Sequence, residues 1–407
     1  MTRTFSLWRN LAASLCFAAA LAVAPAAGQV PGEATALLGR ALELYNAGKT
    51  AEALPLAEQA LVILERQRGP DHADVASALN YLAVLNQQLG RPTEAERFYL
   101  RALNIRQKSL GPDHPQVAVS AENLAALYRS SGRRDEAELL YRRALSINEK
   151  AYGPDHPAVA AIVTGMAVLY QDAGRPRDAE PLYRRALTIA EKTFGPDHPQ
   201  VSASLVSLGA LYRGMGRSVE AEPLFQRALA IDEKNGGADH PNVANVLHEL
   251  AMTYWVQNRI EQVEPLFNRA LAIREKVYGA DHPAVAQTLN AMAGFCRDQG
   301  RHADAEPHFR RVVAMYEKAL GPDHPGVATA LNNLAVLYQE MGRPTDAEPL
   351  AKRALALREK AFGPDNPQLV NTIHNLAELY RTLGRKADAD ALAKRAQAIR
   401  EKGNSSR

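Results

Sequence analysis

The amino-acid sequence predicts an all-α solenoid, in which helix hairpins of one kind stack on one another along the chain. Three observations support this fold class. A short motif returns at a fixed interval, apolar residues within each interval follow helical spacing, and glycine or proline ends each apolar stretch. A constant interval of this kind is typical of a repeat array, which grows by stacking neighbours and needs no single large core.

The repeated motif sets the number of hairpins. GPDHP and its near-copies GPDHA, GADHP and GPDNP begin at residues 69, 111, 153, 195, 237, 279, 321 and 363. The step from each copy to the next is the same throughout, with no insertion or deletion. One hairpin fits before the first copy, in 33–68, and each copy introduces another, so we expect about nine hairpins.

Within one repeat, 325–366, two amphipathic helices are expected. The first half carries an apolar stripe at i, i+3, i+4, i+7 spacing, formed by Leu331, Leu334, Ala335 and Tyr338. Gly342 follows, as is usual just past a helix end where positive φ is required. A second apolar stripe comes after it, formed by Ala347, Leu350, Ala354 and Leu355. The repeat therefore predicts a helix hairpin.

Two hairpins depart from this pattern. Asn258 stands where the other repeats have the turn glycine, and we expect it still to take positive φ. Val263 and Val312 replace a small alanine of the second helix. These two hairpins should therefore pack less regularly than the others.

The linker motif separates one hairpin from the next. Gly321 and Pro322 should end the preceding helix, and Pro325 falls in the first turn of the following one. Asp323 is expected to accept N–H bonds at the start of that helix, whereas His324 has no assigned role. A metal ion needs several ligands at about 2.0–2.2 Å from one centre. Neighbouring linkers should lie roughly 8–10 Å apart, so we expect no metal and no cofactor.

These helix pairs, with small residues at fixed places, resemble the tetratricopeptide repeat. The 42-residue unit is similar to the kinesin-light-chain variety, and the residues that carry the resemblance read LNNLAVLY…GR…DAEPL…RAL…EK…GPDHP over 33–402. The resemblance implies a right-handed superhelix whose first helices line a concave groove. It also implies that the groove binds peptides or protein segments and performs no chemistry. Kinesin transport itself is not implied.

The resemblance further implies which side chains line the groove. In the 325 unit they are Thr329, Asn332, Val336, Gln339 and Glu340, and steps of one repeat give the equivalents in other hairpins. The candidate peptide-binding residues are Asn80, Arg129, Arg213, Asn245, His248, Met252, Trp255, Asn290, Arg297, Asn332, Gln339, His374 and Arg381. Arginine pairs with carboxylates and amides bond a peptide backbone, so this set predicts an extended, acidic partner segment.

Two interpretations of these groove residues stay open. The arginines, which recur in alternate repeats, could equally be solvated helix-surface residues. Trp255 follows His248 and Met252 at i, i+4, i+7 spacing and could be a binding hot spot. The alternative is that Trp255 packs sideways against the next hairpin.

Residues 1–28 predict a secretory signal. Arg3 and Arg9 precede an apolar stretch, 11–24, and small residues follow it. Cleavage is expected after Ala26 or Gly28, which makes the protein periplasmic or secreted. The alternative is an uncleaved membrane anchor, although the stretch is shorter than the ~20 residues of a membrane helix. The remaining segments are the solenoid at 33–402 and a disordered tail at 403–407.

Composition and motifs exclude other function classes. The net charge is +3 without runs of like charge, which does not favour nucleic-acid binding. The sequence contains no GxSxG, GxxxxGK[ST], HExxH or CxxC motif, so we expect neither an enzyme nor a small-molecule substrate. Cys296 is expected to be a small buried apolar residue.

The sequence therefore favours a non-enzymatic protein-interaction module with an unidentified protein or peptide partner. The alternative is a self-associating structural scaffold. The last predicted helix, 388–402, is polar, which favours a capped end and a monomer.

Overall fold

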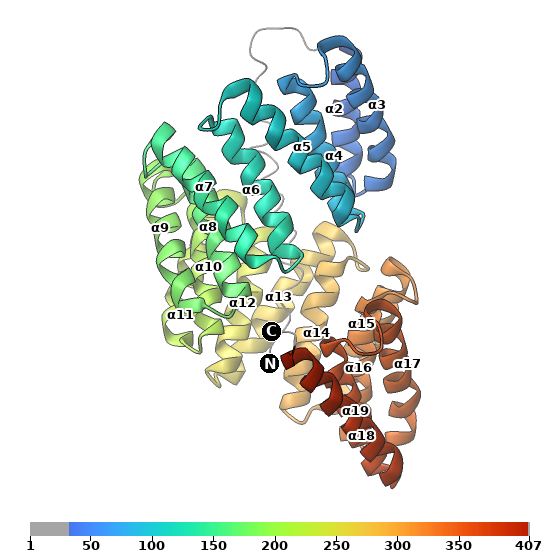
Figure 1. Cartoon of the computed structure of the whole chain (residues 1–407). Coiled ribbons are helices and arrows are strands. Elements are labelled where there is room, and N and C mark those ends of the chain that lie inside the picture. Colours follow the sequence, from blue (N-terminus) through green and yellow to red (C-terminus); the bar gives the residue numbers. More distant parts are fainter. Residues whose placement is uncertain (1–31, 406–407) are drawn as a thin grey trace. The chain divides into compact units, whose positions relative to one another are not determined.

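The computed structural model describes residues 32–405, and every regular element in that range is a helix. Eighteen α-helices follow one another as nine consecutive hairpins (Figure 1). The first helices are α2 (Gly32–Asn46), α4 (Ala73–Gln88), α6 (Pro115–Ser130), α8 (Pro157–Asp172), α10 (Pro199–Gly214), α12 (Pro241–Val256), α14 (Pro283–Asp298), α16 (Pro325–Glu340) and α18 (Val370–Thr382). The second helices are α3 (Thr50–Arg68), α5 (Pro92–Leu110), α7 (Arg134–Tyr152), α9 (Pro176–Phe194), α11 (Ser218–Gly236), α13 (Ile260–Tyr278), α15 (His302–Leu320), α17 (Pro344–Phe362) and α19 (Lys386–Ser405). The predicted all-α array of about nine hairpins is confirmed.

The chain divides into two compact units, 1–211 and 212–407, with the boundary inside α10. Within each unit, consecutive helices pack against one another along the chain. A short 3-10 helix, Pro367–Leu369, precedes α18. The expected leader, 1–28, lies outside the described residues, and α19 continues as helix to Ser405, inside the segment 403–407 that the sequence assigns to a tail.

Most hairpins bury two small residues and an aromatic ring of the second helix. In α13, Val263, Phe267 and Ala270 are fully buried, and the second helices from α5 to α15 all follow the same i, i+4, i+7 pattern. The small residues allow neighbouring helices to approach closely, while the ring fills the space between them. The ring is absent near both ends of the array, where Ala57 and Ala351 take its place.

The turn inside each hairpin requires positive φ after the first helix. Glycine supplies it in most hairpins, as at Gly132 with φ 80°. At the equivalent turn after α12 the residue is Asn258, with φ 59°. Asparagine tolerates this region better than other residues with a side chain, so the prediction that Asn258 can replace the turn glycine is confirmed.

The linker caps the following helix with its histidine, and the prediction that its aspartate does so is wrong. In seven linkers His Nδ1 accepts a hydrogen bond from the backbone N–H two residues later, at 3.0–3.2 Å. Asn366 does the same with its Oδ1 at 2.9 Å. Because the next residue is the first helical one, the histidine holds the N-cap position and the aspartate lies one residue too early.

The linker aspartate instead joins neighbouring hairpins. Asp323 accepts a hydrogen bond from Lys360 Nζ of the next second helix at 2.7 Å. The same 37-residue spacing pairs Asp113 with Lys150, Asp155 with Lys192, Asp239 with Lys276, Asp281 with Lys318 and Asp365 with Lys402. Each pair is exposed to solvent, which screens the attraction, so the ladder contributes more to register than to stability.

A second ladder holds the linker from the same side. Arg185 of α9 donates to the linker carbonyl of Pro154 at 2.9 Å and pairs with Glu149 of α7 at 2.6 Å. Equivalent arginines in α5, α13, α15, α17 and α19 bond a linker carbonyl and a glutamate in the same way. The stacking register of adjacent hairpins is therefore fixed by residues of the repeat itself.

The histidine cap gives a first prediction. His114→Ala should lower the free energy of unfolding by about 1 kcal/mol, because the N–H of Gln116 loses its acceptor. His114→Asn should retain most of the stability, since asparagine already caps the last hairpin at Asn366. Chemical denaturation followed by circular dichroism measures both variants. Equal losses in the two variants would show that the histidine acts through packing and not as a cap.

Candidate functional site

Successive first helices place equivalent residues next to one another, because one 42-residue step advances the chain by one hairpin. We define the first-helix face as the turns of α4, α6, α8, α10, α12, α14, α16 and α18 that carry the predicted site residues and their polar partners. It is described separately in each of the two units. Arg381 and His374 on α18 are exposed, whereas most of the other predicted residues are half-buried.

The predicted arginines are paired with carboxylates of the chain itself. Arg129 Nη1 lies 2.7 Å from Asp172 Oδ2, and Arg213 Nη2 lies 2.7 Å from Glu249 Oε2. In each pair the carboxylate comes from the next first helix.

Two further arginines follow variants of this arrangement. Arg297 pairs with Asp298 at 3.0 Å and approaches Glu340 of the next first helix at 3.7 Å. Arg381, in the last hairpin, pairs with Glu378 of its own helix. The guanidinium groups thus form pairs of opposite charge and are not a row of free cations.

The predicted amides form a similar ladder. Asn333 donates to Asn290 Oδ1 at 2.9 Å, and Asn375 donates to Asn332 Oδ1 at 3.1 Å. Gln339 donates to Thr382 Oγ1 at 3.2 Å. These contacts join α14 to α16 and α16 to α18, so this part of the first-helix face is a polar network held in position before any ligand arrives.

Two of the predicted site residues are more deeply buried than a residue that contacts a ligand is expected to be. Asn80 is 5 % exposed and donates to Ser120 Oγ at 3.3 Å. His248 is 6 % exposed, and its ring packs edge-on against Phe267 of α13 with 5.4 Å between centroids. The physical reason is that this turn of the first helix faces the neighbouring second helix as well as the predicted groove.

Trp255 packs sideways against the next hairpin, which is the second of the two interpretations that the sequence left open. Its ring lies edge-on to Phe295 of α14, with 5.7 Å between centroids. Gly294 makes room for it, since a Cβ there would lie 3.3 Å from the indole. Trp255 and Met252 both remain half-buried.

Sequence analysis missed two buried arginines on second helices, Arg106 and Arg274. Arg274 of α13 is 2 % exposed and donates to Asn245 Oδ1 at 2.9 Å, Thr288 Oγ1 at 2.6 Å and the carbonyl of Ala284 at 3.0 Å. Arg106 of α5 is held by serine hydroxyls and a carbonyl in the same way. The available signal was a charged residue within the apolar stripe of a second helix. The side chain of the site residue Asn245 is therefore hydrogen-bonded by Arg274 of the second helix.

Buried His248, and to a smaller extent exposed His282 and half-buried His308, make the stability of the second unit depend on pH. Burial lowers the pKa of His248 well below its usual value, and the charges of Arg274 and Arg213 lower it further. Partial loss of solvent is the main cause that lowers the pKa of His282 and that of His308. The nearby charge of Arg274 lowers the pKa of His282 further, and that of Arg311 lowers the pKa of His308 further. The folded chain therefore resists protonation that the unfolded chain accepts near about pH 6.5.

The lowered histidine pKa values reduce the stability of the folded chain in acid. Below about pH 6.5 the unfolded state binds more protons, so the free energy of unfolding should fall as the pH drops towards the depressed folded-state values. Urea denaturation at about pH 7 and about pH 5.5 should show this loss, and His248→Gln should reduce it. An unchanged pH dependence in His248→Gln would contradict the assignment to His248.

No helix within 32–405 combines the length and apolar character that crossing a membrane requires. In the same range, no group of three or more His, Cys, Asp or Glu side chains is placed to hold a metal ion.

Comparison with known proteins gives one family. A tetratricopeptide repeat family model matches successive overlapping stretches that run from residue 32 to residue 402, namely 32–108, 74–150, 135–192, 158–234, 208–276, 242–293, 284–360 and 335–402. A search of curated proteins found no match.

Two solved structures share the fold at low sequence identity, and a third matches about half of this chain. A Rap protein complexed with Competence and Sporulation Factor is 15 % identical, with a TM-score of 0.56 over 92 % of this chain and 99 % of that one. Aspartyl phosphate phosphatase F from Bacillus subtilis is 14 % identical, with a TM-score of 0.54 over 93 % of this chain and 96 % of that one. A Podosopora anserina protein described as a putative kinesin light chain with nearly identical TPR-like repeats is 27 % identical, with a TM-score of 0.44 over 51 % of this chain and 98 % of that one.

Proposed function

The chain belongs to the tetratricopeptide repeat family, and from this premise we propose that it is a non-enzymatic protein-interaction module whose first-helix face binds an extended, acidic peptide segment. The observation that carries the proposal is the polar network that joins equivalent positions of successive first helices. A ligand that crosses several hairpins would contact amide or arginine side chains on each first helix. The Rap protein, which has the same fold, was solved with Competence and Sporulation Factor bound.

The network supplies hydrogen bonds for a peptide backbone. Asn290 and Asn332 use their Oδ1 atoms to accept bonds from the neighbouring helix. Their Nδ2 donors are not used in these bonds and can reach peptide carbonyls. Because the amides are already oriented by their neighbours, binding loses little side-chain entropy.

The arginine pairs supply the preference for acidic residues. Arg213 uses Nη2 for Glu249, and its Nε–H has no acceptor within the described residues. Arg129 is arranged in the same way with Asp172. A ligand carboxylate can replace the internal one at the Nη donors, where it accepts a charge-assisted hydrogen bond. The exchange leaves the internal carboxylate without its cation, so the internal ion pair competes with the ligand.

Two substitutions in one pair test this proposal. Arg213→Gln should weaken binding of a glutamate-rich extended peptide pool about tenfold or more, since a hydrogen-bonded charge contributes about 1.5–3 kcal/mol. Glu249→Gln should strengthen binding, because it removes the internal competitor. Fluorescence anisotropy with the labelled pool measures both, and a glutamine-substituted pool shows whether the peptide charge matters.

The matched control is Arg353→Gln, which removes the same charge from an ion pair with Glu317 on the second helices. Its affinity should equal that of the unmodified chain. If Arg213→Gln and Arg353→Gln lower the affinity equally, the effect is long-range charge and the first-helix face is not the binding site.

We also propose that the protein is exported to the cell envelope, on the basis of the leader-like residues 1–28. Cell fractionation followed by N-terminal sequencing tests this. A mature chain that begins at Ala27 or Gln29 is the expected result. An intact N-terminus in the membrane fraction would favour the anchored alternative, and one in the cytoplasm would contradict export.

A further inference from the structure

Three of the nine hairpins within 32–405 lack an aromatic ring that the other six carry at the end of the first helix, and the hairpin of α14 is the one of these three that lies between hairpins with the ring. Six first helices place a tyrosine at this position, namely Tyr128, Tyr170, Tyr212, Tyr254, Tyr338 and Tyr380. All six rings are buried. At the same position α4 carries Asn86, whose amide bonds the carbonyl of Leu82, and α14 carries Cys296.

The tyrosine is held by the same two partners in successive hairpins. In α16, Tyr338 donates its hydroxyl to Glu306 Oε1 of the preceding second helix at 3.1 Å, and the Arg343 guanidinium lies 4.3 Å from the ring centroid. In α6, the hydroxyl of Tyr128 lies 2.8 Å from Glu96, with the Arg133 guanidinium 3.7 Å above the ring. A carboxylate for the hydroxyl and a guanidinium over the ring therefore define this tyrosine seat.

A third partner comes from the next turn of the preceding second helix, as Arg310 Nε does at 2.8 Å from the Tyr338 hydroxyl, and the hairpin of α12 has it too. The Tyr254 hydroxyl accepts a hydrogen bond from Gln226 Nε2 at 3.3 Å, and Arg259 lies 4.0 Å from the ring centroid. Advancing these residues by one repeat leads from Gln226 to Asn268, from Arg259 to Arg301 and from Tyr254 to Cys296. Glu222, which also contacts Tyr254, advances to Glu264.

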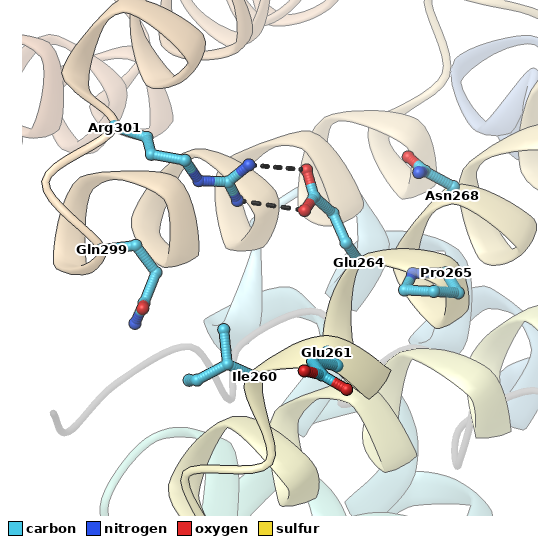
Figure 2. Close-up of a pocket in the computed structure, with 7 residues that line it drawn as sticks. All are labelled: Ile260, Glu261, Glu264, Pro265, Asn268, Gln299 and Arg301. Carbon is cyan, nitrogen blue, oxygen red and sulfur yellow. Dashed lines mark hydrogen bonds and ion pairs between the residues drawn. The ribbon is translucent and has the colours of Figure 1, made fainter.

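In the hairpin of α14, the equivalent residues Glu264, Asn268 and Arg301 line a pocket of about 600 Å³. Its lining consists of Ile260, Glu261, Glu264, Pro265, Asn268, Gln299 and Arg301. Figure 2 shows Arg301, from the turn after α14, and Glu264, from α13, pointing toward one another, and two hydrogen bonds of 3.1 Å join them. The pocket thus keeps the tyrosine seat and lacks the tyrosine.

Neighbouring side chains of α14 do not fill this space. Phe295 is fully buried against Trp255 and is not among the lining residues. Cys296 is itself buried, with its Sγ 3.5 Å from Arg301. The thiol is much smaller than a phenol ring and brings no hydroxyl to Glu264, and the pocket lies beside Glu264 and Arg301.

We propose that this pocket binds a phenol supplied from outside the hairpin, either the tyrosine side chain of a partner segment or a small 4-alkylphenol. The hydroxyl donates to Glu264, the Arg301 guanidinium stacks on the ring, and Ile260 and Pro265 contact its apolar edge. The chain itself demonstrates this chemistry with its own tyrosines. The site lies on α13 and the turn after α14, so it is independent of the first-helix face and of the proposed function.

The test uses p-cresol as the probe and the full chain as the protein. Ligand-observed NMR should show saturable binding with a Kd on the order of 1 mM for this small ligand. Cys296→Tyr places the missing ring in its seat, so it should abolish p-cresol binding and raise the melting temperature. Cys296→Ala keeps the pocket open and should bind p-cresol as the unmodified chain does.

A second variant keeps the test decisive if Cys296→Tyr fails to fold. Glu264→Gln removes the charged acceptor and should weaken p-cresol about tenfold while leaving toluene unchanged. The proposal is overturned if the unmodified chain does not bind p-cresol, or if Glu264→Gln weakens both ligands equally. A folded Cys296→Tyr that still binds p-cresol would also overturn it.

Peptides that differ only in a central tyrosine or phenylalanine identify the source of the phenol. Tighter binding of the tyrosine peptide than of p-cresol assigns the pocket to a protein partner. Binding of p-cresol without a gain from the tyrosine peptide assigns it to a small phenol.

Discussion

Phe267→Ala is expected to lower the free energy of unfolding by about 3–5 kcal/mol. Phe267 is fully buried in α13 between Val263 and Ala270, and its ring contacts His248 of the preceding first helix. Removing the ring leaves a cavity that two helices border, and each hairpin can relax only a little because its neighbours hold it in register. Chemical denaturation and native-state hydrogen exchange measure the loss globally and along the chain.

The matched control for this variant lies on the same helix. Val277 is 43 % exposed, and Val277→Ala should change stability by less than about 0.5 kcal/mol. Hydrogen exchange in Phe267→Ala should rise first in α12 and α13, because stability in repeat arrays is a sum of local and nearest-neighbour contributions. A similar loss in both variants, or exchange spread evenly over the chain, would contradict this description of the core.

Arg274→Ala should be almost as harmful, by about 3 kcal/mol, whereas Arg274→Met should be close to neutral. Burial lowers the pKa of Arg274 to about 10, so the group is still charged at neutral pH. It donates to Asn245, Thr288 and a backbone carbonyl. Both variants leave these acceptors without a donor, but alanine also creates a cavity, whereas methionine fills the space and removes the cost of burying a charge.

Thermal and urea denaturation of the two Arg274 variants separate these contributions. The equivalent position holds Ala190 in α9 and Tyr316 in α15, so the fold accepts uncharged residues there. The account predicts a large gap between the alanine and methionine variants. Equal, large losses would show that the site requires the hydrogen bonds and charge of the guanidinium and not merely its volume.

The hairpin architecture could be predicted because every repeat carries its own signals. Helical spacing, turn glycines and linker prolines act within one 42-residue unit, and their repetition removes ambiguity. The expected burial of Cys296 is also confirmed. The error at the linker is small and instructive: Asp323 and His324 are adjacent, and which of them caps depends on where the helix begins, which a pattern locates only to within a residue or two.

The side chains of the first-helix face were harder to predict because their partners lie in other repeats. Arg129 and Asp172 are 43 residues apart, and Arg213 and Glu249 are 36 apart, so a single repeat shows neither pair. The burial of His248 arises from Phe267 of α13, which likewise lies outside the first-helix pattern. In the sequence, the only sign of the pocket beside Arg301 is Cys296, at a position where six first helices carry tyrosine. Whether such a pocket is open depends on the sizes of all the side chains around it.

The most direct test of the central claim is photo-crosslinking of the glutamate-rich peptide pool to the full chain. A photoreactive residue is placed in turn at Asn290, Asn332 and His374 on successive first helices, and at Val277 and Lys352 on second helices as controls. The account predicts peptide crosslinks from the three first-helix positions and none from the controls. Crosslinks from the second-helix positions, or from one first helix alone, would contradict a binding face shared by successive hairpins.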